Sequence, residues 1–222
     1  MNYERYQLII FDWDGTLMDS INRIVSSVQA AAKSCSLNVP DNSQVRDIIG
    51  LSLPKAMKTL FPNINGSDTA KLIEQYKHQF IAVNDIPMPL FIDTIDLLNT
   101  LTQHDKILAI ATGKGREGLQ RVFKQTHTGH YFKASRCADE ASSKPSPEML
   151  LSLLDELKIA KDRALMVGDS KYDLQMAKTA GIDCIGVTFG VHSRAELSLY
   201  QPIAIVDSLT ELQGLLITNI NG

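Results

Sequence analysis

The chain is poor in the residues that mark several classes of protein. It has 3 cysteines in 222 residues, without the close spacing of a zinc site or a disulfide framework. We expect Cys35, Cys137 and Cys184 to be buried, reduced thiols. No apolar stretch approaches the roughly 18 residues that a membrane span needs. Nor does a basic region precede a long apolar core, as in a signal peptide. We therefore expect a cytoplasmic location and no membrane contact.

An excess of basic residues is missing as well. Lysine and arginine number 22 against 25 aspartates and glutamates, for a formal net charge of -3. A nucleic-acid-binding surface would leave a basic footprint, so we expect no nucleic-acid partner. What is present is an ordinary globular composition, with 44% hydrophobic and 21% charged residues. The length allows one large domain, or a domain that carries an insert.

Short apolar runs alternate with helical patterns over much of the chain. The runs lie at 7–11, 106–111, 164–168, 183–189 and 204–206, with a weaker one at 132–138. Helical patterns at 146–157, 170–181 and 207–216 separate or follow the later runs, and Gly181 is a good helix stop. Strand–helix alternation of this kind predicts an α/β fold, a Rossmann-like, doubly wound parallel sheet covered on both faces.

One segment breaks this alternation, because more than 90 residues without a strand candidate separate the first two apolar runs. A structureless loop of that length is implausible in a compact domain. Three apolar faces with helical spacing indicate a small helical insert instead, which we expect to leave a polar rim over the strand ends. Pro87 and Pro89 mark the linker back, and a helix at about 93–103 follows. We predict a core of residues 1–17 and 87–222 and a helical cap of residues 18–86.

The stretch LIIFDWDGT would place two like charges close together. A buried strand ends here in two carboxylates, Asp12 and Asp14. Residues i and i+2 of a strand share a face, so the two would point the same way and repel each other. One would hold its proton unless a cation is present. The two carboxylates therefore need a positively charged group or ion nearby.

Further polar residues follow the other predicted strands. Ligands of open parallel sheets bind beyond the carboxyl ends of the strands, and this edge would gather Thr112 with Gly113, Lys144, Asp169 and Asp173. Asp12, Asp14 and Asp169 offer the oxygen ligands that Mg²⁺ prefers. Lys144 and Thr112, with nearby backbone amides, suit a phosphoryl group. A magnesium ion bound there would neutralise the charge of the paired carboxylates Asp12 and Asp14.

The same residues suit phosphoryl chemistry. One carboxylate can attack phosphorus and form an aspartyl-phosphate, while the second serves as general acid and base. Spacing does not say which aspartate attacks. Taken singly each signal is modest: Asp-x-Asp-Gly is often a turn, and Gly-Asp-Ser opening a helix is a common N-cap. Their order, each after a separate strand-like run, makes the set specific.

With these motifs the sequence resembles the haloacid dehalogenase superfamily of hydrolases. D-x-D-G-T-L-x-D-S runs from Asp12 to Ser20, Thr112 follows the second strand, Lys144 stands in K-P-x-P, and G-D-S-x-x-D runs from Gly168 to Asp173. The resemblance implies that Asp12 is the nucleophile and Asp14 the general acid and base. It implies that Thr112 and Lys144 hold the phosphoryl oxygens. It also implies that Mg²⁺ binds Asp12, Asp169 and the Asp14 backbone carbonyl, with Asp173 in a supporting position.

The insert resembles the C1-type cap of this family, and the stretch around Gly50 and the C-terminal region are similar to its phosphoglycolate phosphatase branch. By this resemblance Gly50 faces the motifs and is a candidate for substrate contact. One departure concerns Gly113, because many relatives have asparagine after the motif threonine. A side-chain contact to the leaving group is then lost.

The resemblance implies a Mg²⁺-dependent phosphatase that acts on a small phosphorylated metabolite such as phosphoglycolate. A phosphotransferase, for example a sugar phosphomutase, or a pyrophosphatase of the same fold are alternatives. A non-enzymatic receiver domain also combines an acidic pair with a threonine and a lysine on a doubly wound sheet, but it is about half this length and lacks the insert. We expect a monomer or a weak homodimer.

Overall fold

The computed structural model describes residues 3–217. Within them six parallel strands form one sheet in the order β3-β2-β1-β4-β5-β6. The strands are β1 (Leu8–Phe11), β2 (Ile107–Ala111), β3 (Phe132–Arg136), β4 (Ala164–Gly168), β5 (Asp183–Val187) and β6 (Ala204–Val206). The predicted α/β, Rossmann-like sheet is confirmed, and β1 lies at its centre, paired with β2 and β4.

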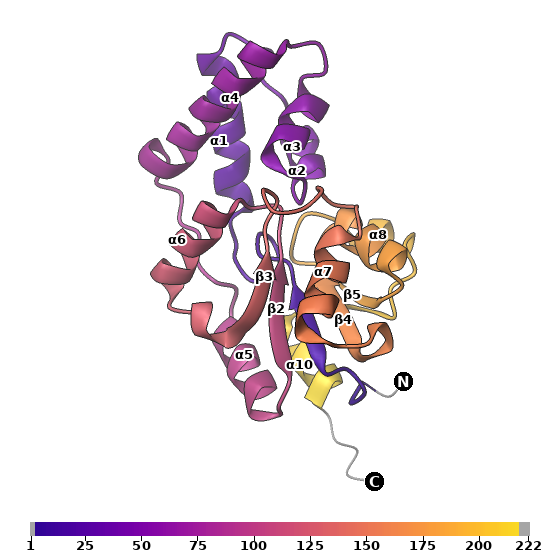
Figure 1. The fold of residues 1–222 in the computed structure, drawn as a ribbon. Coiled ribbons are helices and arrows are strands. Elements are labelled where there is room, and N and C mark those ends of the chain that lie inside the picture. Colours follow the sequence, from indigo (N-terminus) through magenta and orange to yellow (C-terminus); the bar gives the residue numbers. More distant parts are fainter. Residues whose placement is uncertain (1–2, 218–222) are drawn as a thin grey trace.

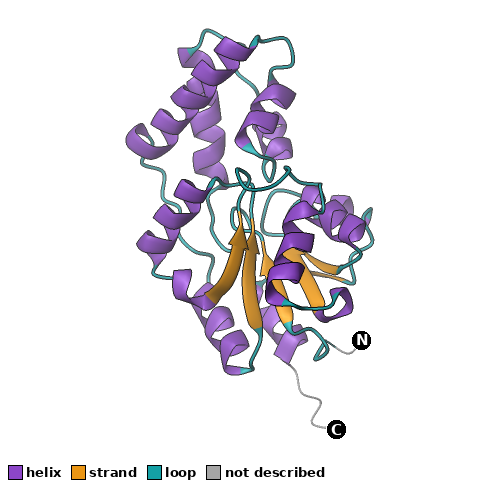
Figure 2. Cartoon of the chain, viewed as in Figure 1, coloured by secondary structure: helices purple, strands orange, loops and turns teal. Residues whose placement is uncertain are grey.

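Helices cover both faces of the sheet (Figures 1 and 2). One face packs on α5 (Thr94–Gln103), α6 (Arg116–Thr126) and α10 (Leu209–Ile217), and the other on α7 (Glu148–Leu157), α8 (Lys171–Ala180) and α9 (Arg194–Ser198). Single 3-10 turns, η2 (Gly129–Tyr131) and η3 (Lys161–Arg163), precede β3 and β4. Alternate residues of β1 pack on opposite faces of the sheet: Ile9 and Phe11 belong to one apolar cluster, Leu8 and Ile10 to the other. Burial on both faces explains why β1 is apolar throughout.

The segment without strands is helical, as predicted. It consists of α1 (Ile21–Ser34), α2 (Asn42–Ile48), α3 (Leu53–Leu60), α4 (Gly66–His78) and one π-helical turn, η1 (Gln79–Val83). These helices share a third apolar cluster that includes Val28, Met57 and Leu72. Val83, the last residue of η1, is 55% exposed and does not belong to this cluster. Figure 1 shows the helical segment beyond the carboxyl ends of the strands. We call residues 18–86 the cap from here on.

Two chain segments connect the cap to the sheet, and they lie side by side. Met18 forms an antiparallel bridge with Leu90. The Asp19 N–H donates to the Pro89 carbonyl at 2.9 Å, and the Phe91 N–H donates to the Leu17 carbonyl at 3.0 Å. The cap is therefore attached at one place, next to the end of β1.

Three helices were not expected from the sequence, namely α2, α6 and α9. Their buried apolar faces are small: α2 buries Val45 and Ile48, α6 buries Leu119 and Val122, and α9 buries Leu197. A face of one or two residues gives a weak periodic signal. The expectation of buried cysteines also needs correction, because Cys35 is only half-buried, whereas Cys137 and Cys184 are buried. None of the helices in residues 3–217 is both long and apolar enough to cross a membrane.

Candidate active site

The site begins where β1 ends. The Asp12 N–H donates to the Val167 carbonyl at 3.0 Å, so the strand pairing continues one residue past β1. Trp13 is fully buried and packs edge-on against Phe123, with ring centroids 5.3 Å apart. This anchored indole fixes the backbone between the two carboxylates. Asp12 and Asp14 thereby both line one cavity between the sheet and the cap.

Asp12 belongs to a buried cluster of charges. Carboxylate oxygens of Asp12, Asp169 and Asp173 lie within 4.8 Å of one another. The Lys144 ammonium lies 3.0 Å from Asp12 Oδ1 and 2.6 Å from Asp173 Oδ1. All four side chains are buried, Asp12 being the most exposed at 2%. With every group ionised, three negative charges face one positive charge, and the cluster carries two negative charges in excess.

This excess shifts the ionisation of the cluster. Burial raises the pKa of Asp12 to about 7; Lys144 opposes the rise, and the carboxylates of Asp173 and Asp14 add to it. Burial likewise raises the pKa of Asp169 well above its usual range, and Asp173 and Asp12 raise it further. Burial by itself lowers the pKa of Lys144, but the attraction of Asp12 and Asp173 outweighs this and leaves it raised. Without a further cation the cluster compensates its charge by holding protons.

Neighbouring groups hold the cluster in place. Asp169 accepts hydrogen bonds from the Thr16 hydroxyl at 2.9 Å and from the Val191 N–H at 2.8 Å. Asp173 accepts the Ser170 hydroxyl at 2.6 Å. Gly15 has a φ of +80°, and a Cβ there would lie 2.2 Å from Asp169 Oδ2. Glycine is therefore needed both for this backbone conformation and for the close approach of the backbone to the Asp169 carboxylate.

The cluster fits a divalent cation. Its donors are carboxylate oxygens, the hard ligands that Mg²⁺ prefers. Asp12 Oδ1 is buried without a hydrogen bond of good geometry to any described residue, although the Lys144 ammonium is close to it. The double positive charge of one divalent ion would also neutralise the two excess negative charges of the cluster. Asp12, Asp169 and Asp173 are therefore the side chains that could hold a metal.

Asp14 lies outside this cluster, although the sequence suggested it as a ligand. Its carboxylate binds Lys114 with both oxygens, at 2.7 and 2.8 Å, and accepts the Ser20 hydroxyl. Only its backbone carbonyl is left for a metal, as the resemblance implies. Asp12 and Asp14 are thus paired with different lysines, Lys144 and Lys114. Sequence reasoning missed the role of Lys114, although the position directly after Thr112 and Gly113 gave a signal.

The other predicted residues divide between the cavity and the layer beneath it. Gly50 and Gly113 line the cavity, whereas Thr112 and Lys144 are fully buried. A Cβ on Gly113 would lie 2.6 Å from the carbonyl oxygen of Gly50 and 2.7 Å from that of Leu51. The cap loop therefore occupies the space that an asparagine side chain would need. This is the physical reason for the departure at position 113.

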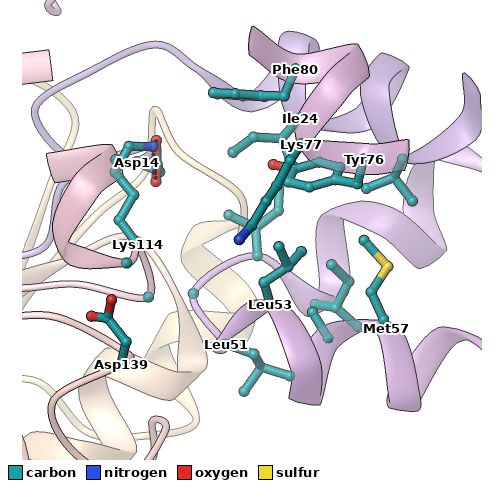
Figure 3. Close-up of a pocket in the computed structure, with 18 of the residues that line it drawn as sticks. Asp14, Ile24, Leu51, Leu53, Met57, Tyr76, Lys77, Phe80, Lys114 and Asp139 are labelled. Atoms are coloured by element: carbon teal, nitrogen blue, oxygen red, sulfur yellow. Dashed lines mark hydrogen bonds and ion pairs between the residues drawn. The ribbon is translucent and has the colours of Figure 1, made fainter. Parts of the chain in front are cut away.

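The cavity between cap and sheet has a volume of about 210 Å³. Figure 3 shows Lys114 directed at Asp14 on one side, and Tyr76, Lys77 and Phe80 facing them from the cap. The cap wall is mostly apolar, with Leu53 and Met57 among its residues. The polar rim that we expected does not extend to this wall, because the apolar faces of the cap helices reach the cavity.

A family model described as haloacid dehalogenase-like hydrolase matches residues 9–187, which contain every residue of the site. The chain belongs to this family. As a haloacid dehalogenase-like hydrolase it is an enzyme, and the resemblance noted in the sequence is confirmed.

The relatives of this haloacid dehalogenase-like hydrolase match it along most of their length. A protein described as probable phosphatase IndB from Dickeya dadantii is 34% identical over 93% of this chain and 92% of its own. A phosphoglycolate phosphatase from Vibrio vulnificus is 28% identical over 96% of each chain. The crystal structure of a putative haloacid dehalogenase-like hydrolase from Bacteroides fragilis superposes with a TM-score of 0.86 at 24% identity, covering 93% of this chain and 99% of that one. This last likeness concerns the fold alone.

Proposed function

We propose that the protein is a Mg²⁺-dependent phosphatase that hydrolyses a small phosphomonoester through an aspartyl-phosphate. That it is a phosphatase follows from its family and from relatives such as the one from Dickeya dadantii. The metal, the intermediate and the substrate are the parts that we propose. The observation that carries them is the buried cluster of Asp12, Asp169 and Asp173 around Lys144, at the edge of a cavity large enough for a small ester.

We assign the first step to Asp12. Its carboxylate oxygen attacks phosphorus, the bond from phosphorus to the ester oxygen breaks, and the leaving alkoxide takes a proton from Asp14. Lys144 and Thr112 hold the phosphoryl oxygens. The position of Asp12 supports this assignment, since it lines the cavity and is also the member of the cluster that Lys144 contacts at 3.0 Å.

The second step restores the enzyme. Water attacks the phosphorus of the aspartyl-phosphate and gives a proton to Asp14, the bond from phosphorus to the Asp12 oxygen breaks, and inorganic phosphate leaves. Lys114 and Ser20 hold the Asp14 carboxylate in place for this role. When bound to Asp12, Asp169 and Asp173, a magnesium ion supplies positive charge that stabilises the charge on the phosphoryl group. Asp173 also keeps Lys144 in position, at 2.6 Å.

We also propose that residues 18–86 act as a cap over a core of residues 1–17 and 87–222. The paired linkers near Met18 and Pro89 would be the hinges. Closure would exclude water and complete the site. The separate apolar cluster of the cap supports this division.

The alternatives differ in what accepts the phosphoryl group. A phosphotransferase or sugar phosphomutase would pass it to a second substrate, and a pyrophosphatase would cleave a phosphoanhydride. A non-enzymatic receiver domain does not agree with membership of a hydrolase family.

The test is release of inorganic phosphate from a panel of phosphorylated metabolites, with and without Mg²⁺. The panel holds phosphoglycolate first, because of the Vibrio vulnificus relative, then sugar phosphates, nucleotides, pyrophosphate and p-nitrophenyl phosphate. We expect Mg²⁺-dependent release from at least one monoester. Release from pyrophosphate alone, or transfer without release, would favour the alternatives, and no turnover of any compound would refute the proposal.

A further inference from the structure

The cap presents an unusually apolar wall to the cavity. Its residues come from α1, α2, α3, α4, η1 and the loop after α2, and include Ile24, Ile49, Leu53, Met57, Phe80 and Ile81. Among the described cap residues that line the cavity, Lys77 alone carries a charge, and the Tyr76 hydroxyl is the other polar side-chain group. A leaving group bound here therefore contacts mostly hydrocarbon on its cap side.

Polar groups on the opposite wall are largely engaged by the protein itself. Lys114 holds Asp14 with both carboxylate oxygens. Asp139 accepts the Arg116 N–H with both of its oxygens, at 3.0 Å each. Glu117 and Arg121, one helical turn apart on α6, also line the cavity; their charges are of opposite sign, and neither forms an ion pair among residues 3–217. On the cap side, few hydrogen-bonding groups besides Lys77 and Tyr76 remain for the hydroxyls of a sugar or for the carboxylate of a small hydroxy acid.

The size of the cavity agrees with a larger, apolar occupant. An apolar cavity of about 150 Å³ binds benzene, and this one has about 210 Å³. A hydroxyl pressed against such a wall loses its hydrogen bonds to water without replacement, which is unfavourable. An alkyl chain or an aromatic ring instead gains from leaving water.

We propose that the leaving group is an apolar alkyl or aryl alcohol that fills this cavity, so that the enzyme prefers alkyl and aryl phosphomonoesters to phosphoglycolate and sugar phosphates. The proposal rests on the phosphatase function proposed above, and it names the substrate class of that site. Lys77, which reaches into the cavity from α4 in Figure 3, is left to contact a single polar group of the ligand.

The first test is binding of n-alkylphosphonates from methyl to hexyl, in Mg²⁺, by titration calorimetry. The carbon–phosphorus bond is not hydrolysed, so binding is measured apart from chemistry. We expect the affinity to rise about fourfold with each methylene until the cavity is full. The matching n-alkyl phosphates, from ethyl to hexyl, should show the same rise in kcat/KM. An affinity that is independent of chain length would overturn the proposal.

Two matched substitutions locate the effect. Ile81 lines the cavity and is 48% exposed, whereas Val39 is a cap residue of similar exposure, 53%, that does not line it. We expect Ile81→Asn to weaken binding of the hexyl compound about tenfold and to leave the methyl compound unchanged, and Val39→Asn to bind both like the wild type. Leu53→Asn, on a different helix, repeats the test should Ile81→Asn fail to fold. Equal behaviour of all three variants would contradict the placement.

A further substitution, at Lys77, tests the alternative that the cavity selects an anionic leaving group through this lysine. On our proposal Lys77→Gln keeps the dependence on chain length. Three results together would refute the apolar proposal: phosphoglycolate is the best substrate, its KM rises strongly in Lys77→Gln, and the alkyl series shows no dependence on chain length. In that case the proposed phosphatase function would still stand. If the phosphonates bind with the expected dependence but no ester is turned over, the proposed function is wrong and the apolar site stands.

Discussion

At the scale of single residues, the central feature is the uncompensated charge beneath the cavity. Asp12, Asp169 and Asp173 are buried with Lys144 as their shared counter-charge. Burial of a net charge is costly, and it is tolerated at sites where a ligand or metal completes the balance. Replacing one carboxylate and removing a metal should therefore have opposite effects on stability.

We expect Asp12→Asn to abolish turnover and to keep the fold. The amide nearly preserves the shape, cannot act as the nucleophile, and removes one of the two excess negative charges. Turnover should fall by about 10³-fold or more, and Tm measured in excess chelator, where no metal binds Asp12, should hold or rise. The measurements are phosphate release and thermal unfolding. Asp85→Asn, at an exposed position of the cap, is the control and should match the wild type; turnover of Asp12→Asn close to that level would remove Asp12 from its assigned role.

Removal of divalent ions should inactivate and destabilise the protein. A ligand that binds only the folded state raises stability, so excess chelator should lower Tm as well as activity. Mg²⁺ should restore both. Ca²⁺ should restore Tm but inhibit turnover, because it takes more ligands at longer distances and would hold Asp12 away from attack. Full activity in chelator would contradict the metal proposal.

At the scale of elements, the ends of strands and the starts of helices place the chemistry. Ser170 caps α8, and Asp173 three residues later completes the capping box while its other oxygen binds Lys144. The capping interpretation of Gly-Asp-Ser is therefore confirmed, and the same turn places Asp173 beside Lys144 in the buried cluster. The start of α6 is held differently: the Arg116 guanidinium binds both oxygens of Glu140, at 2.7 and 2.6 Å, and the Ser135 hydroxyl of β3.

The Arg116–Glu140 pair predicts a pH-dependent contribution to stability. The hydrogen bonds from Arg116 hold the pKa of Glu140 below its ordinary 4.5. A lowered pKa in the folded state means that the contribution is complete above 4.5 and is lost as the pH falls through the lower, folded value. Because a third of the Glu140 side chain is exposed, we expect Glu140→Gln to lower Tm at pH 7 by only about 1–3 °C.

Thermal unfolding at a series of pH values from 7 downwards checks this. The difference in Tm between the wild type and Glu140→Gln should shrink as the pH falls below 4.5. Glu74→Gln is the control, since Glu74 is exposed and forms no ion pair among residues 3–217. A difference that stays constant with pH would show that the charge of Glu140 is not what stabilises the start of α6.

At the scale of the whole molecule, polar contacts hold the cap against the core. Arg46 of α2 donates to the Gly190 carbonyl at 2.8 Å, and Asp47 pairs with Lys171 of α8. The Ser52 N–H donates to the Ser143 hydroxyl at 2.9 Å, beside Lys144. The cap loop at Gly50 therefore lies directly over the residues proposed to bind phosphate.

This closeness makes Gly113→Ala a test of cap closure. The added methyl group would press on the carbonyl oxygens of Gly50 and Leu51, which are backbone atoms and cannot turn aside. We expect kcat/KM to fall about 10- to 100-fold, because the cap cannot close to the same position. The amides of α2 and α3 should also exchange hydrogen faster.

The matched control is Gly66→Ala, since a Cβ there meets no described atom within 4 Å. Gly50→Val is a poorer test, because Gly50 has a φ of +103° and any side chain would strain it whatever the substrate. Wild-type kinetics in Gly113→Ala would show that turnover does not need the closed arrangement described here.

The sheet, the helical insert and most of the candidate site could be predicted from the amino-acid sequence alone. Apolar runs of strand length, each followed by a polar residue, report local structure, and the topology of a parallel sheet brings their ends together. Asp12, Lys144, Asp169 and Asp173 could therefore be predicted as one cluster. The type of each element was also readable, except where α2, α6 and α9 bury too few residues to give a periodic signal.

The contacts between the cap and the core could not be predicted from the sequence and became visible in the three-dimensional structure. The pairing of Asp14 with Lys114, the contact of Gly113 with the Gly50 loop and the apolar wall of the cavity all join residues that are far apart in the chain. Periodicity shows that a helix has an apolar face, but not how much of that face is covered by other helices. In the cap, part of the apolar helix faces is not covered by other helices. This uncovered part lines the cavity, because the packing among the cap helices ends there.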